Sequence, residues 1–79
     1  MPLTESSKKY FFGNSEPQKL RDWSGPNGQL LYEGYAVQGM PQDSSGWVLY
    51  KHFFDGSSND TGDMMLSGKS WALRAVYTF

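Results

Sequence analysis

The strongest apolar pattern in the chain is the run from Trp47 to Gly56, WVLYKHFFDG, in which aromatic and aliphatic residues follow one another closely. Such residues favour a strand, because they fit a pleated and packed surface. Side chains alternate across a strand. One face therefore carries Trp47, Leu49, Lys51 and Phe53, and the other carries Val48, Tyr50, His52 and Phe54. Both faces are largely apolar, which predicts a central strand or a strand covered by a partner protein.

Three further segments have strand character. Gln29 to Val37 alternates between two faces, and Gly34 within it suggests a close backbone approach. Asp63 to Leu66 predicts a short strand, followed by a turn at Ser67 to Ser70. Ser70 to Phe79 predicts the last strand, with an unbroken apolar face made by Trp71, Leu73, Ala75, Tyr77 and Phe79. Residues 38–46 and 56–62 are rich in Gly, Ser, Asn and Asp, which predicts polar loops.

The segment from Ser15 to Ser24 fits two structures. Ser15 and Gln18 have capping-box spacing, and Leu20 and Trp23 share one helical face, which predicts a short helix. The alternative is a strand within residues 18–23, turned by the Gly-Pro-Asn-Gly sequence at residues 25–28. Residues 1–14 are expected to form an extended arm, in which Lys9 to Phe12 is an edge strand or a flap over the core.

Together these elements predict one mainly β domain spanning residues 1–79. The expected fold is a small antiparallel sheet or a partly open barrel or sandwich of about four or five strands. At most one short helix is expected, near residues 16–23. Aromatic residues make up 16% of the chain and charged residues 19%, below the ~25% of an ordinary domain, so the composition argues against intrinsic disorder.

Composition also argues against several functions. The chain has no Cys and a single His, His52, so a thiolate metal site or a histidine cluster is not expected. The net charge of −1 and the scattered Lys and Arg residues argue against nucleic-acid binding. No apolar run reaches the ~18 residues that a membrane span needs. The N-terminal residues lack the apolar core of a secretory signal, so neither membrane insertion nor Sec export is expected.

Candidate chemistry is sparse. Residues 55–63 are rich in Asp, but they do not fit the ligand spacing of an EF-hand calcium loop. The Gly-Lys-Ser sequence at residues 68–70 lacks the earlier glycine of a phosphate loop. His52 could act as a general base with Asp55 or Glu33, although a packed or edge histidine is the favoured interpretation. We therefore expect no enzymatic activity, no cofactor and no small-molecule substrate.

Three lone charges stand within otherwise apolar segments, namely Glu33, Lys51 and Arg74. Glu33 is predicted to pair with Lys51 or Arg74 across neighbouring strands. Such a pair would set the register more than it would add stability, because the desolvation of both charges offsets their attraction.

Three motifs together resemble a group of very short proteins encoded by tailed bacteriophages. They cover Tyr32 to Phe79 and read Tyr32-x-Gly34-Tyr35-Ala36-x-x-Gly39, Trp47-x-Leu49-x-Lys51-x-x-Phe54-Asp55-Gly56 and Trp71-x-x-Arg74-Ala75-x-Tyr77-Thr78-Phe79. The chain departs from the pattern at Ala72, where the group has Asp, and in residues 63–70, which lack its Ala-Asp-Gly sequence. The resemblance implies phage origin and a role in the virion.

We therefore expect a non-enzymatic structural component of a tailed-phage virion, made in the host cytoplasm. It would decorate or cement the capsid, or belong to the neck, tail or baseplate, by packing against other virion proteins or copies of itself. The alternative is a free phage adaptor or inhibitor that binds a host protein through its sheet. The residues expected at the interface are large or charged side chains of the two apolar segments: Trp47, Leu49, Tyr50, Lys51, Phe53, Phe54, Trp71, Arg74, Tyr77 and Phe79.

Overall fold

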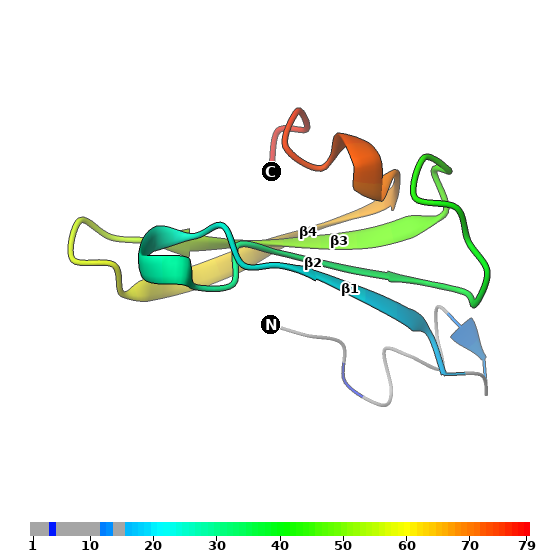
Figure 1. Ribbon diagram of the computed structural model, residues 1–79, viewed down its shortest axis with the longest axis horizontal. Coiled ribbons are helices and arrows are strands. Elements are labelled where there is room, and N and C mark those ends of the chain that lie inside the picture. The colour runs from blue at the N-terminus through cyan, green and yellow to red at the C-terminus, as the bar shows by residue number, and fades with distance from the viewer. Residues whose placement is uncertain (1–3, 5–11, 14–15) are drawn as a thin grey trace.

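The computed structural model describes residue 4, residues 12–13 and residues 16–79. Within these residues, four strands form one open antiparallel sheet whose spatial order is the order of the chain (Figure 1). The strands are β1 (Gln18–Asp22), β2 (Tyr32–Ala36), β3 (Trp47–Phe54) and β4 (Asp60–Lys69). The prediction of a mainly β, antiparallel fold is confirmed. No helix in the described part of the chain is long and apolar enough to cross a membrane.

β3 is a central strand, as its two apolar faces predict. It pairs with β2 on one side, where Tyr35 lies opposite Val48, and with β4 on the other, where Leu49 lies opposite Leu66. The first four residues of β3 are all buried. The sheet therefore has a packed face on each side of this strand.

The short helix predicted near residues 16–23 is wrong, and the alternative of a strand is correct. β1 pairs with β2 so that Leu20 lies opposite Gly34, and partial burial recurs at every second residue of β1. Sheet pairing gives the backbone of this segment its hydrogen bonds, and that tertiary contact overrides the helix signals. The expected turn follows as the 3-10 helix η1 (Pro26–Gly28), in which Asn27 has a φ of 57°.

β4 is longer than the short strand predicted at residues 63–66, and the turn predicted at Ser67 to Ser70 is wrong. Gly68 has a φ of 66° and lies where the register between β3 and β4 shifts. The positive φ of this glycine is accommodated in a β-bulge, so the strand continues to Lys69 instead of turning.

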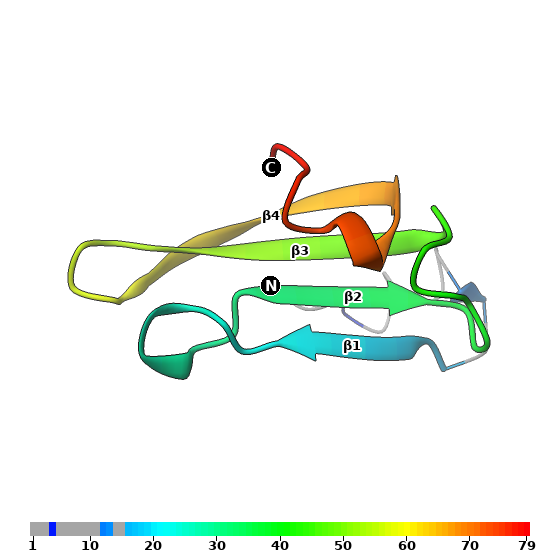
Figure 2. The same ribbon diagram turned by 45° about the horizontal axis from the view of Figure 1, so that its top comes forward.

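The strand predicted from Ser70 to Phe79 is also wrong. The chain leaves the sheet at Ser70, forms the 3-10 helix η2 (Trp71–Leu73) and then turns back across one face of the sheet (Figures 1 and 2). Trp71 lies against Gly34, where a Cβ atom would come within 2.5 Å of its indole ring. Of the predicted apolar face, Trp71 is buried and Tyr77 and Phe79 pack against the core, whereas Leu73 and Ala75 are exposed. The segment covers the open apolar face of the sheet instead of pairing with a strand, and this removes its large aromatic rings from water.

The two faces of the sheet therefore differ in what they pack against. The first, here the C-terminal face, is covered by residues 70–79 and has a buried core of Tyr32, Ala36, Trp47, Leu49 and Trp71. The second, here the His52 face, has buried side chains of Glu33, Tyr35, Val48, Tyr50 and His52, and Phe12 packs against its apolar cluster. The predicted arm and flap otherwise fall mainly outside the described residues.

Candidate functional site

The structure places four of the ten predicted interface residues in the core of the chain itself. Trp47 and Leu49 have no exposed surface, and Trp71 and Tyr50 are buried. These side chains pack in the core of the sheet and are almost completely shielded from solvent. The other six predicted residues are partly buried and keep some surface for a neighbour: Lys51, Phe53, Phe54, Arg74, Tyr77 and Phe79.

Arg74 lies at the centre of a second set of contacts on the C-terminal face. Its Nε and Nη2 atoms both lie 2.9 Å from Oδ2 of Asp22, and its guanidinium carbon lies 4.3 Å from the centre of the Trp71 ring. Partial burial raises the pKa of the Asp22 carboxyl, but the hydrogen bonds from Ser24 and Arg74 together bring it below its usual value. An indole and a carboxylate thus hold one guanidinium between them.

The predicted pairing of Glu33 with Lys51 or Arg74 is wrong, because Glu33 lies on the opposite face of the sheet from both. Arg74 binds Asp22, and the Lys51 ammonium lies over the Tyr32 ring, 5.7 Å from its centre. Glu33 accepts a hydrogen bond of 3.4 Å from the Tyr35 hydroxyl. In the observed register Glu33 lies opposite Tyr50 and Lys51 lies opposite Tyr32, so side-chain alternation places the two charges on opposite faces.

His52 is a packed histidine, as favoured from the sequence. Its Nδ1 atom lies 3.3 Å from Oδ2 of Asp60, and its Nε2 atom lies 3.9 Å from Oε1 of Glu33. The Nε2 atom is buried and has no hydrogen-bond partner. The carboxylate of Asp60 favours the tautomer that carries its proton on Nδ1, since a carboxylate accepts hydrogen bonds.

Asp55, the other partner considered for His52, instead holds the turn between β3 and β4. Its Oδ1 atom accepts the N–H groups of Ser57 and Asn59, at 2.8 Å and 3.0 Å. The hydrogen bonds from Asn59 and Ser57 lower the pKa of the Asp55 carboxyl. The hydrogen bonds of Asp55 therefore stabilise the turn, and the carboxylate that lies beside His52 is that of Asp60.

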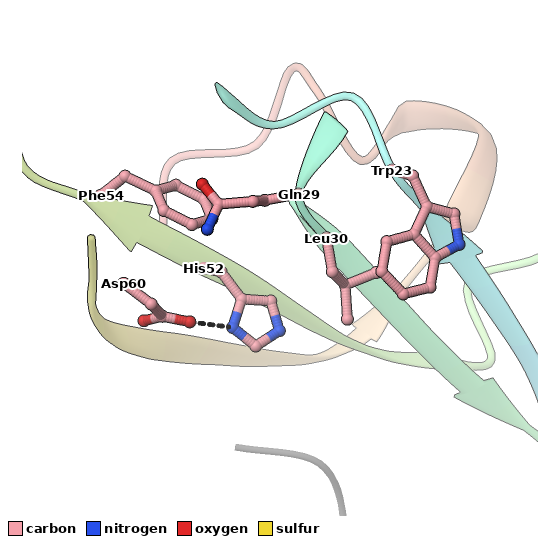
Figure 3. Close-up of a pocket in the computed structure, with 6 residues that line it drawn as sticks. All are labelled: Trp23, Gln29, Leu30, His52, Phe54 and Asp60. Carbon is pink, nitrogen blue, oxygen red and sulfur yellow. Dashed lines mark ion pairs between the residues drawn. The ribbon is translucent and has the colours of Figure 1, made fainter. Parts of the chain in front are cut away.

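A pocket of about 240 Å³ opens beside His52, at the end of the sheet where β1 and β3 end and β4 begins (Figure 3). Trp23 directly follows β1, Phe54 ends β3 and Asp60 begins β4. The pocket combines apolar walls with a carboxylate, and it is lined by Trp23, Gln29, Leu30, His52, Phe54 and Asp60. Trp23 is 60% exposed, so its indole is accessible to a neighbouring molecule.

The pocket brings together an imidazole, a carboxylate and two aromatic rings. Its lining includes no hydroxyl or thiol group that could act as a nucleophile beside His52. Among the described residues, no group of three or more His, Cys, Asp and Glu side chains is placed to hold a metal ion. The sequence did not indicate Asp60 or Trp23 as site residues. Asp60 fell in a predicted loop and Trp23 in a predicted helix, whereas in the structure they lie at the ends of β4 and β1.

β4 forms an edge of the sheet and presents a second accessible surface. Met64 and Met65 at its centre point to opposite faces and are 53% and 43% exposed. The edge carries Asp60 and Asp63 toward its start and Lys69 at its end. No known protein family, curated protein or solved structure matches this chain.

Proposed function

We propose that this protein is a non-enzymatic structural component of a tailed-phage virion that acts by packing in several copies. The phage-like motifs between Tyr32 and Phe79 support the virion role. The edge of β4 is the observation that carries the packing mechanism. A long edge strand with exposed apolar side chains is a surface that other chains pair with, unless charges or a covering element protect it.

The partner that fits the β4 edge is a second copy of the same strand in antiparallel orientation. Between its two register shifts, β4 has a regular stretch from Gly62 to Ser67. Antiparallel pairing brings the acidic end of each strand beside Lys69 of the other, whereas parallel pairing would bring like charges together. It also places the exposed methionines at the centre of the contact, where their apolar surface is removed from water.

The virion role is tested on purified particles of the phage that encodes the chain. Mass spectrometry of particles banded on a density gradient should detect the protein in a fixed ratio to the major capsid protein. Absence from the particles would overturn the proposal. Recovery of the protein with a host partner in infected cells would then support the alternative of a free adaptor or inhibitor.

The packing mechanism is tested by sedimentation of the recombinant chain. The wild type should associate as its concentration rises, and the double variant Met64→Lys and Met65→Lys should remain monomeric because four lysines would meet at the paired edge. Val76→Lys is the matched control, since Val76 is 72% exposed and lies outside β4. Association by the double variant at the wild-type concentration would exclude the β4 edge as the contact.

A further inference from the structure

We propose that the pocket between Trp23 and Asp60 binds an arginine side chain of a partner protein. Figure 3 shows the indole of Trp23 on one side of the group and Phe54 on the other, with Asp60 and His52 across from Gln29 and Leu30. Aromatic rings and a carboxylate around one pocket are the groups that attract an organic cation. The inference concerns the chemistry of the occupant and does not depend on a role in the virion.

The charge around the pocket favours a cation. Residues 53–68 contain Asp55, Asp60 and Asp63 and no Lys or Arg. The Asp60 side chain is 51% exposed, so a ligand can reach its carboxylate. Its Oδ1 atom accepts the Gly62 N–H at 2.9 Å, which fixes the orientation of the carboxylate. None of the six lining residues is Lys or Arg, and Arg21 on the same face of the sheet lies 3.9 Å from the carboxylate of Glu33. The acidic lining therefore suits a cation better than an anion.

The lining also presents a hydrogen-bond acceptor that a ligand can reach, the carboxylate of Asp60. The Asp60 side chain is half exposed, whereas Oε1 of Gln29 and Nε2 of His52 are buried and face the interior. A guanidinium carries five N–H donors in one plane, so it suits such a lining better than an alkyl or aromatic side chain does.

The chain already uses the same combination of groups elsewhere. On the C-terminal face, the Arg74 guanidinium stacks on the indole of Trp71 and bonds to the carboxylate of Asp22. Trp23 and Asp60 offer an indole and a carboxylate to the same end of the sheet. Arginine is preferred to lysine because its plane stacks on an indole while its edge pairs with a carboxylate.

The test is a titration of the 15N-labelled chain with Nα-acetyl-arginine amide, followed by NMR. The indole N–H signal of Trp23 should shift saturably, with a dissociation constant on the order of millimolar. The indole signals of Trp47 and Trp71 are internal controls, because these rings are 0% and 5% exposed. The uncharged Nα-acetyl-citrulline amide has nearly the same shape and should bind at least roughly twofold more weakly.

Two variants separate the carboxylate from general effects of charge. Asp60→Asn should weaken binding of the arginine amide by about two- to fivefold, the usual contribution of an exposed ion pair. Asp43→Asn removes an exposed acid from the loop before β3 and should leave binding unchanged. Unchanged signals of the buried indoles verify that each variant is folded.

Equal binding of the arginine and citrulline amides, or equal binding to the wild type and Asp60→Asn, would overturn the proposal. Tighter binding of Nα-acetyl-leucine amide would overturn it in favour of an apolar occupant. Neither result would bear on the presence of the protein in particles or on its association through β4, so the two proposals fail separately.

Discussion

The two faces of the sheet are stabilised in different ways. On the C-terminal face, aromatic rings pack on one another, and the ring centres of Trp47 and Trp71 are 6.2 Å apart. The Arg74 guanidinium lies 2.9 Å from the carboxylate of Asp22. On the His52 face, the buried Glu33 and His52 are 3.9 Å apart, and one buried nitrogen has no hydrogen-bond partner. Glu33 has partners in Tyr35 and Arg21, but a buried polar atom left without a hydrogen-bond partner costs stability. We therefore expect the C-terminal face to contribute more to the stability of the fold than the His52 face, which carries the pocket for which we propose an arginine ligand.

The largest effect should come from removing Trp47 on the C-terminal face. Trp47→Ala should lower the free energy of unfolding by about 3–5 kcal/mol, because the ring is fully buried and also donates a hydrogen bond of 2.9 Å to the Pro41 carbonyl. A chain of this size has about 4–12 kcal/mol of stability in total. Urea unfolding should therefore show a variant that is marginally folded at 25 °C.

Val48→Ala tests the comparison at the neighbouring position on the His52 face. Val48 is also buried, but the change removes only two methyl groups, so the loss of stability should be clearly smaller. If the two variants lose equal stability, the C-terminal face does not dominate the fold.

The part of this fold that the sequence predicts best is the nearly continuous apolar run from Trp47 to Phe54, in which both faces of a strand are apolar. Trp47 to Phe54 was predicted as a central strand with the correct residues on each face, because strand alternation fixes both. Ser70 to Phe79 also alternates between apolar and other residues, but it forms the segment that covers the C-terminal face of the sheet. In this segment alternation marks only part of what meets the core, since Leu73 is 52% exposed, and it cannot show whether the backbone pairs with a strand or crosses a face.

A second effect on the C-terminal face should come from Gly34→Ala. The added methyl group would lie 2.5 Å from Cε3 of Trp71 and 3.2 Å from Cε3 of Trp47, so the C-terminal segment would have to move. We expect a loss of about 1–3 kcal/mol in the free energy of unfolding. Gly56→Ala is the matched control, because a Cβ atom there would meet no neighbour within 4 Å. Equal stability of the two variants would show that Trp71 does not pack on Gly34.

The contact between Arg74 and Asp22 should contribute less to the free energy of unfolding than the packing of Trp71 on Gly34 does. Arg74→Gln should cost about 1–2 kcal/mol at pH 7, since it removes a charge-assisted contact that is only partly exposed. The pKa of Asp22 lies below its ordinary value of 3.8, so its ionised form stabilises the folded state above that pH. This contribution is lost as the pH falls through the lowered pKa, and the wild type and the variant should converge in acid.

Urea unfolding at pH 7 and below pH 4 measures this convergence. Lys19→Gln removes a cation from the exposed side of β1 and is the control for net charge. A difference between the wild type and Arg74→Gln that stays constant in acid would contradict the role of Asp22.

The candidate pocket was not predicted from the sequence, and the reason lies in the ends of the strands. Trp23 was assigned to a helix face and Asp60 to a loop. Both lie beside His52 only because β1 ends at Asp22 and β4 begins at Asp60. The local pattern does not specify where a strand ends, since pairing with the neighbouring strands decides it. The predicted pair of Glu33 and Lys51 failed because the register decides which residues of neighbouring strands share a face, and Glu33 lies opposite Tyr50 instead of Lys51.

The smallest effect should come from Tyr35 on the His52 face. Tyr35→Phe removes a hydroxyl that donates a long bond of 3.4 Å to Glu33, so the cost at pH 7 should be about 0.5–1.5 kcal/mol. Burial, together with the negative charge of Glu33, raises the pKa of Tyr35 to about 12. In the unfolded chain this hydroxyl ionises near pH 10, so the wild type should lose stability as the pH rises from about 10 toward 12.

The alkaline pH dependence distinguishes this role from a simple loss of packing. Tyr35→Phe lacks one titrating group, so its stability should fall less steeply than that of the wild type above pH 10. Burial also raises the pKa of Tyr50, so part of the fall should remain. Hydrogen bonds from Ser70 lower the pKa of Tyr77 on the C-terminal face, so Tyr77→Phe should have the opposite effect and make the fall steeper. Urea unfolding at pH 7, 10 and 11 measures the stability of the wild type and both variants. The same dependence of stability on pH in all three would show that the two faces do not shift the pKa values of their tyrosines in opposite directions.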